Sequence, residues 1–124
     1  MNYFFVGFGA AAGGVLRYWL SNYTYKYFPE SFPVGTLVVN VIGSFILGLV
    51  MFYFSEKELI SPHLRIFLTI GFCGGFTTFS TFSYETINLF RDAQIGPGLL
   101  NILLNLVLCL VGIYLAYLIS QLIK

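Results

Sequence analysis

Charged side chains are scarce in this 124-residue sequence. Asp, Glu, Lys and Arg together make up 9% of it, and the formal net charge is only +1. A soluble domain carries about 25% charged residues, and a chain of this length cannot bury a 58% hydrophobic composition in a soluble core. The scarcity of charge therefore excludes an ordinary soluble protein and predicts a single membrane-embedded domain over residues 1–124. No nucleic-acid partner is expected.

Residues that ligate metals or form disulfides are equally rare. His63 is the only histidine, and Cys73 and Cys109 are the only cysteines. Both cysteines fall inside apolar runs, where packing as small hydrophobic side chains is the favoured role. Without a cluster of His, Cys and carboxylates the sequence does not predict a metalloenzyme, and no enzyme activity is expected.

What the sequence has in abundance is apolar length without charge. Four runs contain no charged residue, namely residues 1–16, 31–55, 66–84 and 93–123. A membrane-spanning helix needs about 20 apolar residues, so each run accommodates one span if the first takes in Arg17. We therefore predict an all-α membrane protein with four transmembrane helices, at about residues 3–25, 34–54, 63–90 and 98–122. Gly96-Pro97-Gly98 is placed in a loop before the fourth helix.

The Lys and Arg residues give almost no signal for orientation. With four spans, Lys57, Arg65 and Lys124 lie on one side of the membrane, and Lys26 and Arg91 lie on the other. Topology follows the Lys/Arg bias between loops, and three against two is hardly a bias. Two interpretations stay open, a weak signal that is read one way and dual topology. Two copies in opposite orientations would supply eight helices around a two-fold axis, the inverted-repeat arrangement of many transporters.

The first predicted helix combines small residues with one charge. Gly9 and Gly13 stand four residues apart, as do Ala10 and Gly14, and this spacing allows close helix packing. Arg17 follows on the same helix, and an arginine within a span is costly and a functional candidate. The favoured role of this arginine is structural, namely to tie down a helix end through backbone carbonyls.

Neutral polar side chains mark the second and fourth helices. Thr36, Asn40 and Ser44 are spaced i, i+4, i+8 and so share one helix face. Asn101 and Asn105 repeat the i, i+4 spacing in the fourth helix. Such residues either hydrogen-bond between helices or line a water-filled path, where an Asn amide offers N–H donors to an anion without trapping it by charge.

The third helix is unusual at its centre, where the sequence reads GFCGGFTTFSTFS over residues 71–83. Glycines weaken an α-helix and threonines add β-branching, so we predict that the helix is interrupted at its centre. An interruption within the bilayer leaves backbone groups that must be satisfied. Two alternatives stay open, a Gly/Thr-rich packing surface without an ion and a cation held by unwound carbonyls, as in discontinuous helices. In a symmetric antiparallel dimer, two carbonyls from each copy would form a four-oxygen cage at the axis.

Phe79 and Phe82 follow the predicted interruption at i, i+3 and share a face. In a sequence with 14 phenylalanines, core packing is a strong explanation. Their neighbours Ser80, Thr81 and Ser83 are polar, however, and the positive edge of a phenyl ring can receive an anion weakly. The pair is therefore a candidate anion contact.

Three motifs together resemble the Fluc family of fluoride channels, also called CrcB. The most specific motif is GFCGGFTTFSTFSYE at residues 71–85, with Phe76 where leucine is common in the family. The strings GTLVVNVIGSF (35–45) and GGVLRY (13–18) are similar to the second and first helix motifs of the family. The motifs occur in the family's order and the resemblance covers nearly the whole chain, whereas the fourth helix matches more loosely.

The resemblance implies a passive fluoride channel of the plasma (inner) membrane that lowers cytoplasmic fluoride. It also implies a dual-topology homodimer with two anion pores and a central structural sodium ion. The residues expected along the anion pathway are Thr36, Asn40, Phe79, Ser80, Thr81 and Phe82. The backbone carbonyls of Gly74 and Thr77 would bind the sodium ion, and Arg17 and Asn105 are expected to be structural polar residues. Fluoride itself is implied by the resemblance alone.

Two other functions compete with this interpretation. A proton-coupled multidrug exporter with four helices needs an ionisable carboxylate in the bundle, and Glu85 is the only acidic residue close to a span interior. A membrane subunit that anchors a partner would not need an interrupted third helix. Fluoride efflux from liposomes separates the three functions.

Overall fold

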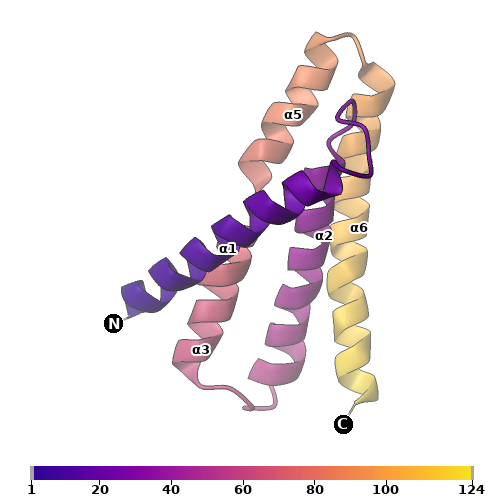
Figure 1. Ribbon diagram of the computed structural model, residues 1–124. Coiled ribbons are helices and arrows are strands. Elements are labelled where there is room, and N and C mark those ends of the chain that lie inside the picture. Colours follow the sequence, from indigo (N-terminus) through magenta and orange to yellow (C-terminus); the bar gives the residue numbers. More distant parts are fainter. Residues whose placement is uncertain (1, 124) are drawn as a thin grey trace.

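Helices dominate the computed structural model, which describes residues 2–123 and has no β-strand in that range. Helix α1 (Asn2–Thr24) crosses obliquely over the other helices, whereas α2 (Val34–Leu49) and α6 (Ile95–Leu122) run side by side (Figure 1). The start of α1 and the end of α6 both lie in the lower half of the figure. The predicted all-α class is confirmed. Lys124, which the charge count uses, lies outside the described residues.

Three stretches are long and apolar enough to cross a membrane, namely Val34–Ser55, Pro62–Arg91 and Ile95–Leu122. The first is α2 continued by the wider, π-helical turns of η1 (Val50–Ser55). The second is built from α3 (Pro62–Ile66), η2 (Phe67–Cys73), α4 (Gly74–Phe76) and α5 (Phe79–Arg91). Helix α1 has 23 residues, enough for a span, but its tyrosines, asparagines and single arginine make it less apolar than these three.

The helix starts follow local capping chemistry. Pro33 precedes α2, where its fixed φ favours helix entry. Ser61 caps α3, because its Oγ accepts a hydrogen bond of 3.1 Å from the Leu64 N–H. Thr78 caps α5 in the same way, with its Oγ1 accepting from the Thr81 N–H at 3.2 Å.

The start of α6 differs from the sequence prediction. The helix begins at Ile95 and takes in Gly96, Pro97 and Gly98, which were expected to form a loop. Proline is tolerated there because the N–H that it lacks has no helical partner in the first turn. A Cβ on Gly98 would overlap the ring of Phe90, so this glycine permits the tight turn from α5 into α6.

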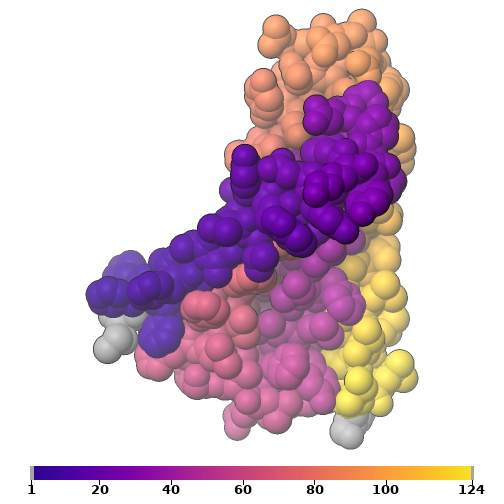
Figure 2. Space-filling model, in the orientation of Figure 1, coloured from indigo at the N-terminus to yellow at the C-terminus, as the bar shows by residue number. Residues whose placement is uncertain are grey.

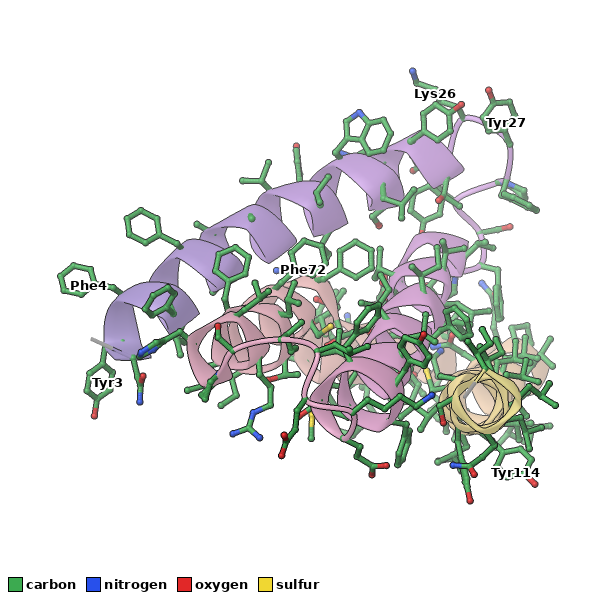
Figure 3. The ribbon with its side chains drawn as sticks, turned by 90° about the horizontal axis from the view of Figure 1, so that it is seen from below. Tyr3, Phe4, Lys26, Tyr27, Phe72 and Tyr114 are labelled. Atoms are coloured by element: carbon green, nitrogen blue, oxygen red, sulfur yellow. The ribbon has the colours of Figure 1, made fainter. Side chains whose placement is uncertain are left out.

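Glycines allow α1 to lie directly on the backbone of Pro62–Arg91, which we call the third span, in the order of the four predicted helices. A Cβ on Gly9 or Gly13 would overlap backbone atoms of Phe67 or Phe72, whereas Gly14 has open space around it. Of the two small-residue pairs in α1, only Gly9/Gly13 has both members at the close contact, since Ala10 also approaches the backbone of Gly75 but Gly14 has open space. The side chain of Phe72 lies between α1 and the neighbouring helices (Figure 3).

The opposite face of α1 exposes large apolar side chains such as Phe4, Val15 and Trp19. Phe4 points away from the other helices, as do Lys26 and Tyr27 in the connection after α1 (Figure 3), and the first turns of α1 project beyond the body of the molecule (Figure 2). Exposed aromatic and aliphatic residues are also spread over the three apolar spans. Such a surface suits lipid or protein contact and not water.

Candidate functional site

The third span changes conformation near its middle, at Thr77 and Thr78. Thr77 has φ −89° and ψ 162°, and Thr78 has φ −153° and ψ 117°, both in the extended region. Helix α4 ends just before this pair and α5 begins just after it. The Thr77 N–H and Oγ1 both donate to the Cys73 carbonyl, at 2.9 and 2.8 Å. We call residues 77–78 the extended segment.

One side chain satisfies both backbone groups of Thr78. The Thr78 N–H donates to Oδ1 of Asn40 at 2.8 Å, and Nδ2 of Asn40 donates to the Thr78 carbonyl at 3.1 Å. Inside a membrane such groups cannot turn to water, so they need an internal partner. The other Nδ2 hydrogen bond of Asn40 goes to Oδ1 of Asn105 at 3.1 Å. Both N–H groups of Asn40 therefore have protein acceptors.

A larger cavity, of about 590 Å³, lies on one side of the extended segment. Residues of α2, the third span and α6 line it, namely Asn40, Gly43, Ser44, Leu47, Thr69, Cys73, Gly74, Thr77, Thr78, Phe79, Phe82, Ile102, Asn105, Leu106, Cys109 and Leu110. Predicted pathway, cation and structural residues thus meet at one place. The rings of Phe79 and Phe82 are 5.4 Å apart between centroids and tilted by 54°. Phe79 is 78% exposed in the single chain.

A smaller cavity, of about 140 Å³, borders the same segment and is more polar. It is lined by Arg17, Tyr18, Ser21, Asn22, Thr36, Val39, Thr78 and Thr81. The predicted pathway residues Thr36 and Thr81 lie here, apart from Asn40 and the two phenylalanines. Thr78 lines both cavities. Sequence analysis missed this residue, although its place between the predicted cation ligand Thr77 and the predicted pathway residue Phe79 was a signal.

Arg17 has two contacts that matter for the smaller cavity. Its Nε donates to the Gly75 carbonyl at 3.0 Å, which ties α1 to α4, and the side chain also lines the cavity wall. Among the residues that line the two cavities, Arg17 alone is positively charged. An anion in the smaller cavity would therefore lie near a positive charge.

Two further polar side chains lie near this region. Ser80 is exposed, lines neither cavity, and has its Oγ 3.3 Å from Oγ1 of Thr78. Glu85 lies beside the side chain of Thr36, and its buried Oε1 has no hydrogen-bond partner among residues 2–123. Neither Glu85 nor the predicted pathway residue Ser80 therefore lines a cavity.

The predicted cation ligands are the carbonyls of Gly74 and Thr77. The neighbouring carbonyls of Cys73, Gly75 and Thr78 accept hydrogen bonds. No donor among residues 2–123 bonds to the Gly74 or Thr77 oxygen. Unpaired carbonyl oxygens are the ligands that a hard cation takes, so the residues present fit a sodium ion.

These features define a class of protein, a helical multi-pass membrane protein with polar groups gathered at two cavities beside an extended segment. Residues 4–117 match the family described as CrcB-like protein, Camphor Resistance (CrcB), and the chain belongs to this family. The family resemblance predicted from three sequence motifs is thereby confirmed. The family is one of ion channels, which is not an enzyme class.

Curated relatives share this assignment. The chain is 47% identical over 107 residues to a protein of Geotalea daltonii, with 86% of each chain covered. It is 45% identical to a protein of Geotalea uraniireducens, with 90% of each covered. It is 51% identical to a protein of Clostridium novyi, over 87% of this chain and 84% of the relative. All three are named fluoride-specific ion channel FluC. The protein is thus a multi-pass integral protein of the plasma membrane.

Proposed function

We propose that the protein is a fluoride-selective channel that lets fluoride leave the cell passively and so lowers its cytoplasmic concentration. The observation that carries the proposal is the pair of cavities that share Thr78 in the middle of a membrane span. The names of the relatives supply the choice of anion. An ion that crosses the bilayer needs a succession of polar groups along its path through an otherwise apolar bundle.

The donors along this route suit a small anion that must leave again. Thr36, Thr81 and Arg17 line the smaller cavity, and Phe79 and Phe82, whose ring edges can receive an anion weakly, line the larger one. At the boundary, a fluoride ion can take over an Asn40 N–H from its neutral acceptor, because hydrogen bonds to an ion are about twice as strong. Chloride is larger and a weaker acceptor, so it gains less from the exchange.

The walls of the cavities favour a channel over a coupled transporter. Neither lining includes a carboxylate or an imidazole. Proton-coupled transport through a membrane needs an ionisable group of this kind in the pathway. Passive flow down the fluoride gradient requires no such group.

We propose further that two copies assemble in opposite orientations, each with four spans including α1. The larger cavity lies at the surface of the single chain, where Phe79 and Leu106 remain exposed. A second copy packed on this face would close the route and cover its apolar rim. The near balance of Lys and Arg between the two sides supports insertion in both orientations.

A structural sodium ion at the axis of this dimer completes the proposal. Gly74 and Thr77 of each copy would supply two carbonyl oxygens, four in all. The support is that no donor among residues 2–123 bonds to these carbonyls, and unpaired backbone groups within hydrocarbon cost several kcal/mol each. The bound cation would also attract a passing anion.

The test is fluoride efflux from liposomes that contain the purified protein, followed with a fluoride electrode. We expect efflux without any proton or sodium gradient, and chloride efflux lower by orders of magnitude. Liposomes without protein give the background. Fluoride movement that appears only when a proton gradient is imposed would refute the channel.

A further inference from the structure

Four buried side chains link α5, α6 and α2 in one hydrogen-bonded series, which we call the amide chain: Thr86, Asn101, Asn105 and Asn40. Asn101 is 1% exposed and Thr86 5% exposed. Neither lines the larger or the smaller cavity. The amide chain connects the interior of the bundle to the extended segment, and its hydrogen bonds have a fixed direction.

The direction is fixed first at α5. The Thr86 hydroxyl donates to the Phe82 carbonyl at 2.7 Å, and this carbonyl can only accept. The Thr86 oxygen must therefore accept from Nδ2 of Asn101, which lies 2.9 Å away. The Asn101 amide is thus oriented with its oxygen facing away from Thr86.

The orientation passes on through α6 to α2. Nδ2 of Asn105 donates to Oδ1 of Asn101 at 3.0 Å and to the Asn101 carbonyl at 2.9 Å. This leaves Oδ1 of Asn105 as the acceptor for Nδ2 of Asn40. Each amide settles the orientation of the next one.

The opposite end demands the same orientation independently. The Thr78 N–H can only donate and its carbonyl can only accept. Asn40 must therefore present Oδ1 to the first and Nδ2 to the second, as it does at 2.8 and 3.1 Å. The oxygen and nitrogen of a side-chain amide are normally assigned from their hydrogen-bond partners. Here the partners at both ends of the amide chain require the same orientation.

We propose that Thr86 and Asn101 are positioning residues of the ion route, acting on Thr78 through Asn105 and Asn40. The functional part of this inference rests on the proposed channel function. Loss of the Thr86 acceptor would free Asn101 and then Asn105 to reverse, and a reversed Asn105 would set its Nδ2 against Nδ2 of Asn40, so that two donors face each other. Asn40 would then either lose this hydrogen bond or turn its Oδ1 toward the Thr78 carbonyl and an arriving anion. The hydroxyl of Thr86 therefore supports, from outside both cavities, the amide orientation that meets the ion.

The test compares two threonines that are alike except for this connection. Thr24 is 6% exposed and its hydroxyl donates to the Leu20 carbonyl four residues earlier at 2.8 Å, as that of Thr86 does to Phe82. Thr86→Val should lower fluoride efflux per folded protein by about tenfold, the size expected for one lost buried hydrogen bond. It should also weaken discrimination against chloride. Thr86→Ser should restore efflux, and Thr24→Val should leave it unchanged.

Hydrogen exchange of the Thr78 amide gives a readout that does not depend on transport. Thr86→Val should speed this exchange, and Thr24→Val should not. If the parent moves no fluoride, the channel function fails, whereas faster exchange in Thr86→Val would still support the positioning role. The inference is overturned if exchange at Thr78 is unchanged in Thr86→Val, or if a conducting parent and Thr86→Val show equal efflux and selectivity.

Discussion

At Thr78 a single residue borders both cavities while its backbone groups are held by one side chain. Asn40 contacts Thr78 from α2, 38 positions earlier in the sequence. An extended residue inside a bilayer is tolerated only with such a partner. The same contact that stabilises the segment therefore places the Asn40 amide in the wall of the larger cavity, beside the residue that lines both cavities.

Asn40→Ala should nearly abolish fluoride efflux and also destabilise the protein. Alanine leaves the N–H and the carbonyl of Thr78 unpaired, at a cost of about 1–3 kcal/mol for each buried group. Efflux per folded protein and thermal unfolding in detergent measure the two effects. Asn88→Ala on α5, which lines neither cavity, is the control. Normal efflux per folded protein in Asn40→Ala would remove this residue from the pathway.

Phe79→Ile and Phe82→Ile should each reduce efflux severely while the protein stays folded. Isoleucine keeps much of the side-chain volume and removes the positive ring edge. Phe72→Ile is a matched control, because Phe72 stacks on Phe76 at 5.6 Å and lines neither cavity. If both cavity variants conduct like the parent, the two rings serve packing only.

At the scale of elements, the close approach of α1 to the third span depends on individual glycines. Gly13→Ala should destabilise the protein by about 1–3 kcal/mol, because the added methyl overlaps the Phe72 backbone and must push α1 outward. Gly14→Ala, one position later in open space, should be neutral or slightly stabilising, since alanine favours a helix over glycine. Thermal unfolding compares them, and equal melting temperatures would contradict the glycine contact.

A second prediction at this scale concerns Gly74, which lies in α4 just before the extended segment. A Cβ on Gly74 meets only the Thr69 carbonyl, at 3.9 Å, so the single chain accommodates a side chain there. Gly74→Val should nevertheless abolish the effect of sodium on dimer stability, because the side chain would crowd the proposed carbonyl cage. Thr77→Ala keeps its carbonyl and should retain the effect. Dimer dissociation is measured in sodium chloride and in the chloride of a large organic cation. A sodium effect of equal size in Gly74→Val would remove this carbonyl from the cage.

The spans were predictable from sequence because their signals are local. Residues 34–54 and 63–90 were expected, and Val34–Ser55 and Pro62–Arg91 are found. Proline and glycine at residues 96–98 misled the prediction because both also occur in the first turn of a helix, where α6 uses them. Local composition alone does not distinguish the two cases.

The candidate site was predictable only as a set of residue types. Polar residues on α2 and α6 were identified, but the partner of Asn40 depends on how α2 is rotated against the third span. That rotation is set by packing between distant residues, for example by Gly43, whose missing side chain makes room for Thr77. Fixing such pairs needs the three-dimensional arrangement, so the role of Thr78 and the direction of the amide chain were missed.

At the scale of the whole molecule, the open side of the larger cavity and the weak charge bias point to the same assembly. One chain leaves Phe79 at its surface, and an antiparallel partner would cover it. Such a dimer requires that the membrane hold both orientations in similar amounts. Three Lys and Arg residues against two allow this, because the bias that sets topology is nearly absent.

Shifting that balance should therefore abolish activity without touching the ion route. Glu30→Lys, Ser31→Lys, Asp92→Lys and Gln94→Lys together would give six positive residues against three in favour of one side, and Glu56→Lys with Glu58→Lys would give five against two in favour of the other. All these positions are exposed and outside both cavities. Each of the two variants alone should take a single orientation, detectable by labelling of an added surface cysteine, and should lose efflux. Co-expression of the two should restore it, because opposite orientations are again present. If each variant conducts alone while holding one orientation, the antiparallel assembly is wrong and one orientation suffices to complete the pathway.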